Sequence, residues 1–285
     1  MSRARLGWLR VRIGGPPVNR ACRVRAFPCF PGGLCQAGSV RGLLAQFRIG
    51  AGDVVSLVGA GGKTTLLGRL AAEARQGGLR VIVTSTTHMG AGRPPGEPIL
   101  LDTDPKPLAR LDNALRTQGH AIVLGRRIRP DKIRGLPPGQ VDGLRGMADL
   151  ILVEADGARG RSLKVPAAYE PVLPPSSTAV IVVAGIDVLG SSLDEERVHR
   201  VELLSSATAT ARGALVDEQV LVSALRFPAG YLARVPPHAR CGVFLNKVEG
   251  PDRRAVATRI ARALAPPYAF VAAGSARGGP VELWP

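Results

Sequence analysis

The sequence of 285 residues contains few cysteines, few aromatic residues, few lysines and no long apolar run. Phe, Trp and Tyr together make up 4% of the chain, and no apolar run approaches the roughly 18 residues that a membrane span requires. Three of the four cysteines lie in the first 39 residues at spacings too wide for a metal-binding knuckle. These absences argue against a membrane protein and against a disulfide-stabilised secreted protein, so we expect a cytoplasmic protein without a membrane partner.

The formal net charge of +16 is unevenly distributed along the chain. Residues 1–48 contain nine arginines and no acidic residue, and the remainder contains 29 basic and 22 acidic residues. Aromatic side chains are not interleaved with the arginines, as stacking on nucleic-acid bases would require. We therefore expect no nucleic-acid partner.

Residues 1–39 are rich in Gly, Pro and Arg and show neither a helical nor a strand period. They lack the continuous apolar segment of a secretory signal, and Pro16 and Pro17 would interrupt an amphipathic targeting helix. We expect this stretch to be a basic extension that is disordered or precedes the true start of the chain, near Val40. Residues 40–285 are then the folded domain, and deleting 1–39 should leave its folding and ligand binding intact.

From residue 53 onward, short apolar segments alternate with longer amphipathic ones. The expected strands are 54–58, 80–84, 120–124, 149–153, 179–184, 241–245 and 268–273, and the expected helices are 63–76, 105–117, 194–204, 215–226 and 250–264. The strand segments are nearly unbroken Val, Ile and Leu, which is typical of parallel strands covered on both faces. The pattern predicts an α/β fold, a three-layer sandwich with a mostly parallel sheet, and the glycine-rich turn described next makes it P-loop NTPase-like.

A glycine-rich turn joins the first expected strand to the first expected helix and suggests a phosphate site. Its residues are Gly59, Ala60, Gly61, Gly62, Lys63, Thr64 and Thr65. Glycines allow backbone N–H groups to face an anion, and the helix start adds partial positive charge. Lys63 would contact the β- and γ-phosphates and Thr64 would bind Mg²⁺. Leu57 stands where the longer form of this motif has glycine, so the turn is of a shorter type.

A carboxylate for magnesium is expected at the end of a neighbouring strand. Glu154 follows the apolar segment 149–153, and Asp156 and Gly157 come next. The spacing resembles the second phosphate-sensing motif of nucleotide switches, in which the acid holds Mg²⁺ and the glycine N–H faces the γ-phosphate. We predict that Glu154 binds the metal with Thr64 and that Asp156 orients a water or a second ligand.

Two short motifs at later strand ends suggest which base is bound. Asn246, Lys247 and Glu249 resemble the guanine-recognition motif of GTPases, with glutamate in place of aspartate, and Ser275 resembles its second, Ser-Ala element. Their order favours GTP slightly over ATP. Residues 84–88 could place hydroxyl groups near Mg²⁺ or could simply end a strand, and Arg159, Arg161 and Lys164 add positive charge near the expected phosphates.

Five segments together resemble the selenium-dependent hydroxylase accessory protein family YqeC. They read "VSLVGAGGKTTLL", "VTSTTHM", "LVEADGARGRSLKVPAAYEPVLP", "AGIDVLGSSLDEERVHR" and "FLNKVE". The resemblance covers residues 40–275. It implies a bacterial P-loop protein that takes part in maturing molybdenum hydroxylases with a labile selenium-containing cofactor, and its partners would be such a hydroxylase or its cofactor-maturation proteins.

The combined prediction is a domain that binds, and in the favoured interpretation hydrolyses, ATP or GTP with Mg²⁺. The catalytic residues would be Lys63, Glu154 and Asp156. Two alternatives stay open at this point. One is an ATP-dependent ligase or kinase, because short glycine turns of this kind also occur there. The other is a nucleotide-sensing scaffold without turnover.

Overall fold

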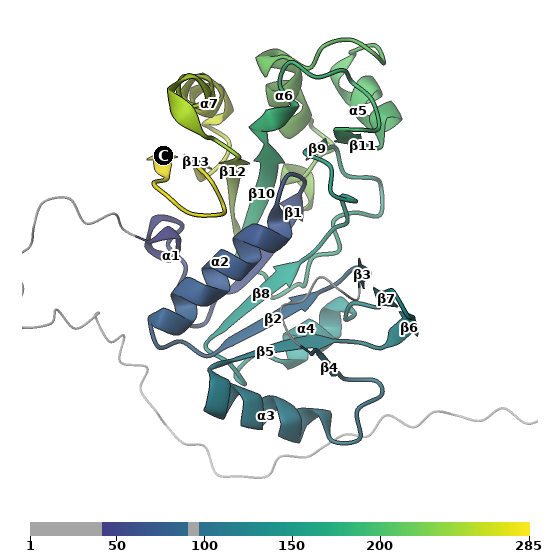
Figure 1. The fold of residues 1–285 in the computed structure, drawn as a ribbon, viewed down its shortest axis with the longest axis vertical. Helices are drawn as coiled ribbons and strands as arrows, with labels where there is room; N and C mark the ends of the chain where they lie inside the picture. Colours follow the sequence, from purple (N-terminus) through teal and green to yellow (C-terminus); the bar gives the residue numbers. More distant parts are fainter. Residues whose placement is uncertain (1–41, 91–96) are drawn as a thin grey trace, which may run out of the picture. The chain divides into compact units, whose positions relative to one another are not determined.

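The computed structural model describes residues 42–90 and 97–285, so the predictions for residues 1–39 lie outside the described part of the chain. A nine-stranded sheet in the order β14-β13-β12-β10-β1-β8-β2-β5-β4 organises these residues (Figure 1). Its strands are β1 (Val54–Gly59), β2 (Val81–Ser85), β4 (Ile99–Leu100), β5 (His120–Leu124), β8 (Leu150–Glu154), β10 (Ala179–Gly185), β12 (Arg240–Asn246), β13 (Phe270–Ala273) and β14 (Glu282–Trp284). All pairings are parallel except β13 with β14. Each of the seven predicted strands is therefore confirmed.

Helices cover both faces of this sheet (Figure 1). One face carries α1 (Leu43–Gln46) and α2 (Lys63–Gln76). The other carries α3 (Pro107–Gln118), α4 (Pro138–Gly143), α5 (Val201–Thr208), α6 (Glu218–Leu225) and α7 (Gly250–Leu264). The predicted three-layer α/β sandwich is confirmed. In the described part of the chain, no helix is both long and apolar enough to cross a membrane.

The continuous apolar strands follow from this double covering. Within β1, Val55 and Leu57 pack beneath α2, whereas Val54 and Val58 pack on the opposite side. All six residues of β1 are buried, as expected for a central parallel strand. Among the described residues the two faces are unequally covered: on one face α2 spans β1, β8 and β2, and the short α1 is the only other helix there.

The predicted helix over 194–204 is wrong in its first half. Val198–His199 form β11, which pairs with β9 (Leu163–Lys164), and α5 begins only at Val201. Arg200 between them adopts φ 61°, in the left-handed region, and ends the strand. A pairing with a distant segment thus overrides local helical preference. The other short elements are β3 (Met89–Gly90), β6 (Arg127–Arg129) and β7 (Lys132–Ile133), which form a separate small sheet, and the 3-10 turns η1 (Ile186–Val188) and η2 (Leu232–Arg234).

Candidate functional site

The carboxyl ends of the central strands bring most of the predicted residues to one edge of the sheet. Strand β1 lies between β8 and β10, so the turn after Gly59 is flanked by Glu154 at the end of β8 and by Gly185 at the end of β10. Asn246 ends β12 and pairs with Gly185. Ligands of open α/β sheets bind at this edge.

The turn between β1 and α2 is short and needs its glycines. Leu57 lies fully buried inside β1, so the turn begins only at Gly59 and α2 begins at Lys63. Gly59, Gly61 and Gly62 have φ values of 91°, 87° and 121°, which side chains rarely allow. A Cβ at Gly59 or Gly61 would also clash with backbone atoms of β10. The turn is therefore held against the neighbouring strand by close backbone packing.

The start of α2 presents a row of N–H groups without acceptors. The N–H of Ala60 donates to Val183 O and that of Gly61 to Arg161 O, both at 2.8 Å. The next four N–H groups, of residues 62–65, have no acceptor among the residues that the structure describes. The first turn of α2 carries no acidic residue, and its N-cap, Gly62, has no side chain. This helix start is therefore an uncompensated partial positive charge, suited to an anion.

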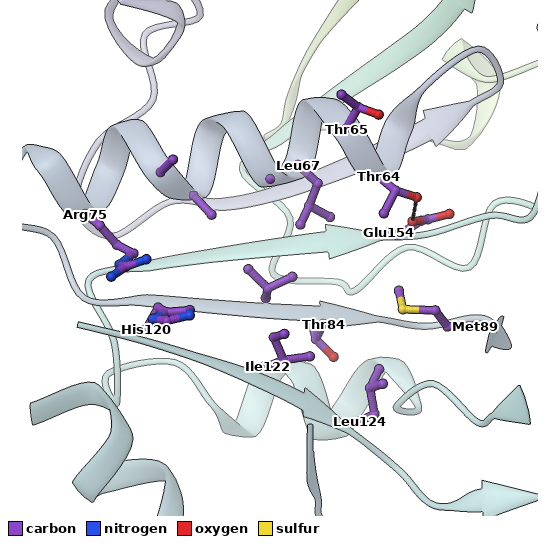
Figure 2. Close-up of a pocket in the computed structure, with 14 residues that line it drawn as sticks. Thr64, Thr65, Leu67, Arg75, Thr84, Met89, His120, Ile122, Leu124 and Glu154 are labelled. Carbon is purple, nitrogen blue, oxygen red and sulfur yellow. Dashed lines mark hydrogen bonds between the residues drawn. The ribbon is translucent and has the colours of Figure 1, made fainter. Parts of the chain in front are cut away.

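Thr64 and Glu154 meet beside these N–H groups, and Figure 2 shows their side chains in contact. Thr64 Oγ1 donates to Glu154 Oε2 at 2.9 Å, and Glu154 is 6% exposed. Both are hard oxygen ligands of the kind that Mg²⁺ prefers, and Mg²⁺ usually takes only one or two protein ligands besides phosphate and water. The residues therefore fit a magnesium ion held jointly with a phosphate. No group of three or more His, Cys, Asp or Glu suited to a metal occurs in the ranges 42–90 and 97–285, which leaves this pair without a competing carboxylate cage.

Lys63 folds back beneath the turn. Its Nζ donates to Gly59 O at 2.6 Å and lies 3.1 Å from Asp156 Oδ1, and the side chain is 4% exposed. The lysine thus sits at the anion-binding end of α2 with its charge partly balanced from below. Asp156 Oδ1 accepts no hydrogen bond among the described residues, so the contact with Lys63 is an ion pair only.

Asp156 lies where the sequence did not lead us to expect it. We predicted that it orients a water or a second ligand, but the carboxylate is fully buried under the turn. Its Oδ2 accepts from Gly59 N–H at 2.9 Å and from the Tyr231 hydroxyl at 3.1 Å, and it lies 3.1 Å from Lys164 Nζ. Asp156 therefore positions the turn and Lys63 rather than facing solvent.

A chain of charges continues from Asp156 to the surface. Lys164, which we expected to add positive charge near the phosphates, is buried and donates to Glu170 Oε2 at 2.8 Å and to Gly157 O at 2.7 Å. Arg200 lies 3.0 Å from Glu170 and donates to the exposed Tyr169 hydroxyl at 2.7 Å. Three cations and two carboxylates thus run in sequence from Lys63 to Arg200, which leaves one positive charge in excess.

Two pKa values reflect this buried chain. Burial and the neighbouring Asp156 charge raise the pKa of Tyr231 well above its ordinary value, so the hydroxyl remains a hydrogen-bond donor. Burial, together with the charges of Lys164 and Arg200, lowers the pKa of His199 to about 4. His199 is therefore neutral at physiological pH.

Asn246 joins three of the predicted motifs. Its Nδ2 donates to Gly61 O at 2.6 Å, and its Oδ1 accepts from Ala276 N–H at 2.8 Å. The amide is 4% exposed and holds the glycine turn next to the segment that contains Ser275. Ser275 itself is half-buried, and its carbonyl accepts from Arg69 at 2.7 Å.

Lys247 and Glu249, unlike Asn246, do not bond to the glycine turn or to the segment of Ser275 among the described residues. Lys247 Nζ donates to Ser162 Oγ and to Asp187 Oδ2, both at 2.8 Å. Glu249 is exposed, and it precedes α7 as its N-cap without a side-chain capping bond. The prediction that Glu249 faces a base is therefore neither supported nor opposed by a contact within the chain.

A cavity of about 310 Å³ opens above the turn. Its lining residues are Gly61, Gly62, Lys63, Thr64, Thr65, Glu154, Ala158, Arg159, Gly160, Arg161 and Lys247. The guanidinium groups of Arg159 and Arg161 have no acceptor among the described residues, so they add uncompensated positive charge to the cavity. Gly157 lies beside the cavity, and its N–H likewise has no acceptor in the described part of the chain.

Some residues of this site carry no recognisable sequence signal. Tyr231 lies 75 positions from Asp156 in a loop without a motif, and Asp187 and Ser162 meet Lys247 from two different segments. Of the hydroxyl-rich residues 84–88, Ser85 donates to Glu154 O at 2.9 Å and Thr86 to Val172 O at 2.6 Å, so these two hydroxyls stabilise the strand ends.

Comparison with known proteins agrees with the resemblance of the sequence motifs. Residues 55–202 match the family described as "YqeC protein". The chain is 37% identical over 199 residues to the "Uncharacterized protein YqeC" of Escherichia coli (strain K12), a match that covers 68% of this chain and 75% of that protein. Among solved structures it is similar to FtsY from Mycoplasma mycoides (12% identity, TM-score 0.39, 82% of this chain) and to chloroplast FtsY from Physcomitrella patens (17%, 0.40, 88%). The chain covers 63% and 64% of those two FtsY chains. The family match and the Escherichia coli relative together show that this protein belongs to the YqeC family.

Proposed function

We propose that this protein binds a nucleoside triphosphate with Mg²⁺ at the turn between β1 and α2 and hydrolyses it. The observation that carries the proposal is the row of four N–H groups, of residues 62–65, that lack acceptors in the described part of the chain. Lys63, Thr64 and Glu154 lie directly beside them. A triphosphate placed there would meet backbone donors, a lysine and a metal-binding oxygen pair at once.

In this proposal the residues act by positioning and charge neutralisation. The N–H groups would hold the phosphate chain, and Lys63 would turn from Gly59 O toward the β- and γ-phosphates. Thr64 and Glu154 would hold Mg²⁺, which when bound neutralises charge on the phosphates. Arg159 and Arg161 would stabilise negative charge that develops on the γ-phosphate. Asp156 would keep Lys63 at the required position without contacting the nucleotide.

GTP is the favoured nucleotide, with ATP as the alternative. Asn246 supports this choice, because it hydrogen-bonds both to Gly61 in the turn and to Ala276, next to Ser275. A base-recognition element must lie beside the phosphate turn in this way. Glu249 would accept hydrogen bonds from guanine, which adenine does not offer. The binding of Lys247 to Asp187 leaves the lysine beside the cavity and not extended into solvent.

We further infer that nucleotide turnover serves the maturation of a selenium-dependent molybdenum hydroxylase in the cytoplasm. This inference rests on the family to which the chain belongs and on the motifs shared with it. The partner would be the hydroxylase or one of its maturation proteins. Hydrolysis that accelerates when the purified apo-hydroxylase is added would support it, and unchanged hydrolysis would count against it.

The binding step is tested with fluorescent GTP and ATP analogues and Mg²⁺. We compare the wild type with Lys63→Ala, with Thr64→Val and with Lys106→Ala, an exposed lysine at the start of α3 that serves as the matched control. The proposal expects Mg²⁺-dependent binding that Lys63→Ala weakens by roughly 100-fold and Lys106→Ala leaves unchanged. Equal binding by all variants, or none by the wild type, would contradict it. Circular dichroism of each variant verifies that it is folded.

A further inference from the structure

A second cavity, of about 360 Å³, lies between α2 and the part of the sheet formed by β2 and β5 (Figure 2). Its walls are mostly apolar. The residues that line it are Thr64, Thr65, Leu67, Gly68, Ala71, Ala72, Arg75, Val83, Thr84, Met89, His120, Ile122, Leu124 and Glu154. A volume above 300 Å³ with apolar walls and a few polar groups at the ends is typical of a small-molecule site.

The cavity exists because α2 presents small side chains toward this half of the sheet. Gly68, Ala71 and Ala72 lie on the side of α2 that lines the cavity, and none of them reaches across to β5. A Cβ added at Gly68 would meet nothing within 4 Å. Opposite them, Val83 from β2 and Ile122 and Leu124 from β5 line the cavity and belong to the same apolar cluster as the residues of α2.

The two ends of the cavity differ in chemistry. At one end Figure 2 shows Arg75, from the last turn of α2, and His120, from the start of β5. The Arg75 guanidinium has no acceptor among the described residues, so this end can hold an anion. At the other end lie Thr64 and Glu154, the pair that would hold Mg²⁺. The cavity thus continues directly into the phosphate site, with which it shares Thr64, Thr65 and Glu154.

We propose that this cavity binds a second ligand, a small organic molecule with an apolar body and one anionic group. The anionic group would pair with Arg75 and the apolar body would pack on Ala71, Val83 and Ile122. Residues 64 to 75 of α2 span about 16 Å at 1.5 Å per residue, so a ligand that fills the cavity reaches from Arg75 to the metal-binding pair. The end of the ligand remote from Arg75 would then lie next to the terminal phosphate of the nucleotide. This placement rests on the proposed function, but binding of the ligand in the cavity does not.

The test uses two probes that differ in charge: 8-anilinonaphthalene-1-sulfonate and its neutral counterpart N-phenyl-1-naphthylamine. Each is titrated into the full chain without nucleotide, and fluorescence is recorded. Gly68→Leu fills the cavity, and Ala255→Leu, at an exposed position of α7, is its control. Arg75→Glu reverses the charge, and Arg262→Glu is its control, because both arginines lie in the last turn of a helix.

The proposal expects Gly68→Leu to abolish saturable binding of both probes and Ala255→Leu to leave it intact. Arg75→Glu should weaken binding of the sulfonate probe roughly fivefold and binding of the neutral probe much less. Arg262→Glu should change the affinity for neither probe. Binding that is unaffected by Gly68→Leu, or reduced equally by both arginine variants, would overturn it. Because these titrations contain no nucleotide, they separate failure of the cavity from failure of the phosphate site. A repeat with Mg²⁺ and GTP then tests whether the two sites influence one another.

Discussion

Lys63 Nζ lies 3.1 Å from Asp156 Oδ1, and both side chains are buried beneath the glycine turn. The lysine that would contact phosphates is thus held by a carboxylate that does not reach the open cavity. Asp156 also lies 3.1 Å from Lys164 Nζ, which has Glu170 as its second acidic neighbour at 2.8 Å. This arrangement makes Asp156 a positioning residue. Glu154 and Asp156 are two positions apart in the sequence, but Glu154 lines the open cavity and Asp156 lies beneath the turn.

Replacing Asp156 should destabilise the protein strongly. Asp156→Asn leaves the buried Lys63 without its counter-charge, whereas Lys164 keeps Glu170 at 2.8 Å, and removal of one partner of a buried ion pair costs about 3–5 kcal/mol. Tyr231→Phe removes only one hydrogen bond to the same carboxylate and should cost about 1 kcal/mol. Urea denaturation of both variants measures the two free energies of unfolding. Equal, small losses for both would contradict the assigned role of Asp156.

Thr64→Val and Glu154→Gln should reduce the dependence of nucleotide binding on Mg²⁺. Thr64→Val removes the hydroxyl that lies 2.9 Å from Glu154 Oε2, and Glu154→Gln removes the negative charge of the carboxylate. The N–H groups of the turn stay in place in both variants. We expect binding in the presence of Mg²⁺ to fall roughly 10- to 100-fold and binding in EDTA to change little. Titrations with and without EDTA provide the measurement. A similar loss in both conditions would show that the substitutions disturb the turn itself.

Asn246→Ala should weaken binding of both GTP and ATP, whereas Glu249→Ala should weaken binding of GTP and leave binding of ATP unchanged. Asn246 bonds to Gly61 O and Ala276 N–H, so its loss disturbs the turn whatever the base is. Glu249 is exposed and makes no capping bond, so its removal should leave the fold intact. Competition between the two nucleotides gives the ratio of affinities. If Glu249→Ala leaves this ratio unchanged, the guanine assignment is wrong.

His199 should make folding stability depend on pH between about 6.5 and about 4. Burial and nearby cations lower its pKa to about 4 in the folded state, whereas the unfolded chain has the ordinary value of 6.5. In this interval the unfolded state binds the proton and the folded state does not, so the free energy of unfolding falls as pH falls. The imidazole is only partly shielded from water, so after allowance for screening we expect a contribution of about 1 kcal/mol. His199→Gln should flatten this part of the stability profile, and an unchanged slope would contradict the assignment.

The strands and the glycine turn were predictable because each is determined by neighbouring residues. Buried parallel strands are nearly unbroken runs of apolar residues, and the turn requires glycine at 59, 61 and 62. The position of Glu154 was predictable as well, because the carboxyl end of a parallel strand lies at the same edge of the sheet as the glycine turn.

The surroundings of Asp156 were not predictable, because they depend on contacts between distant segments. Asp156 is two residues beyond Glu154, yet it faces the buried underside of the turn, where Tyr231 and Lys164 come from other loops. The helix expected over 194–204 failed for the same reason, since the pairing of β11 with β9 is a tertiary contact. The local sequence pattern could place Asp156 and Lys164 near the site, but it could not show which side chains they contact.

Amide hydrogen–deuterium exchange of residues 60–66 tests the central claim most directly. The four N–H groups of residues 62–65 lack acceptors within the described part of the chain and should exchange fast in the free protein. Addition of GTP or ATP with Mg²⁺ should slow exchange in this segment, and the Lys63→Ala variant should show little of that protection. Exchange that stays fast in saturating nucleotide, or protection confined to other segments, would show that the turn does not hold a phosphate chain.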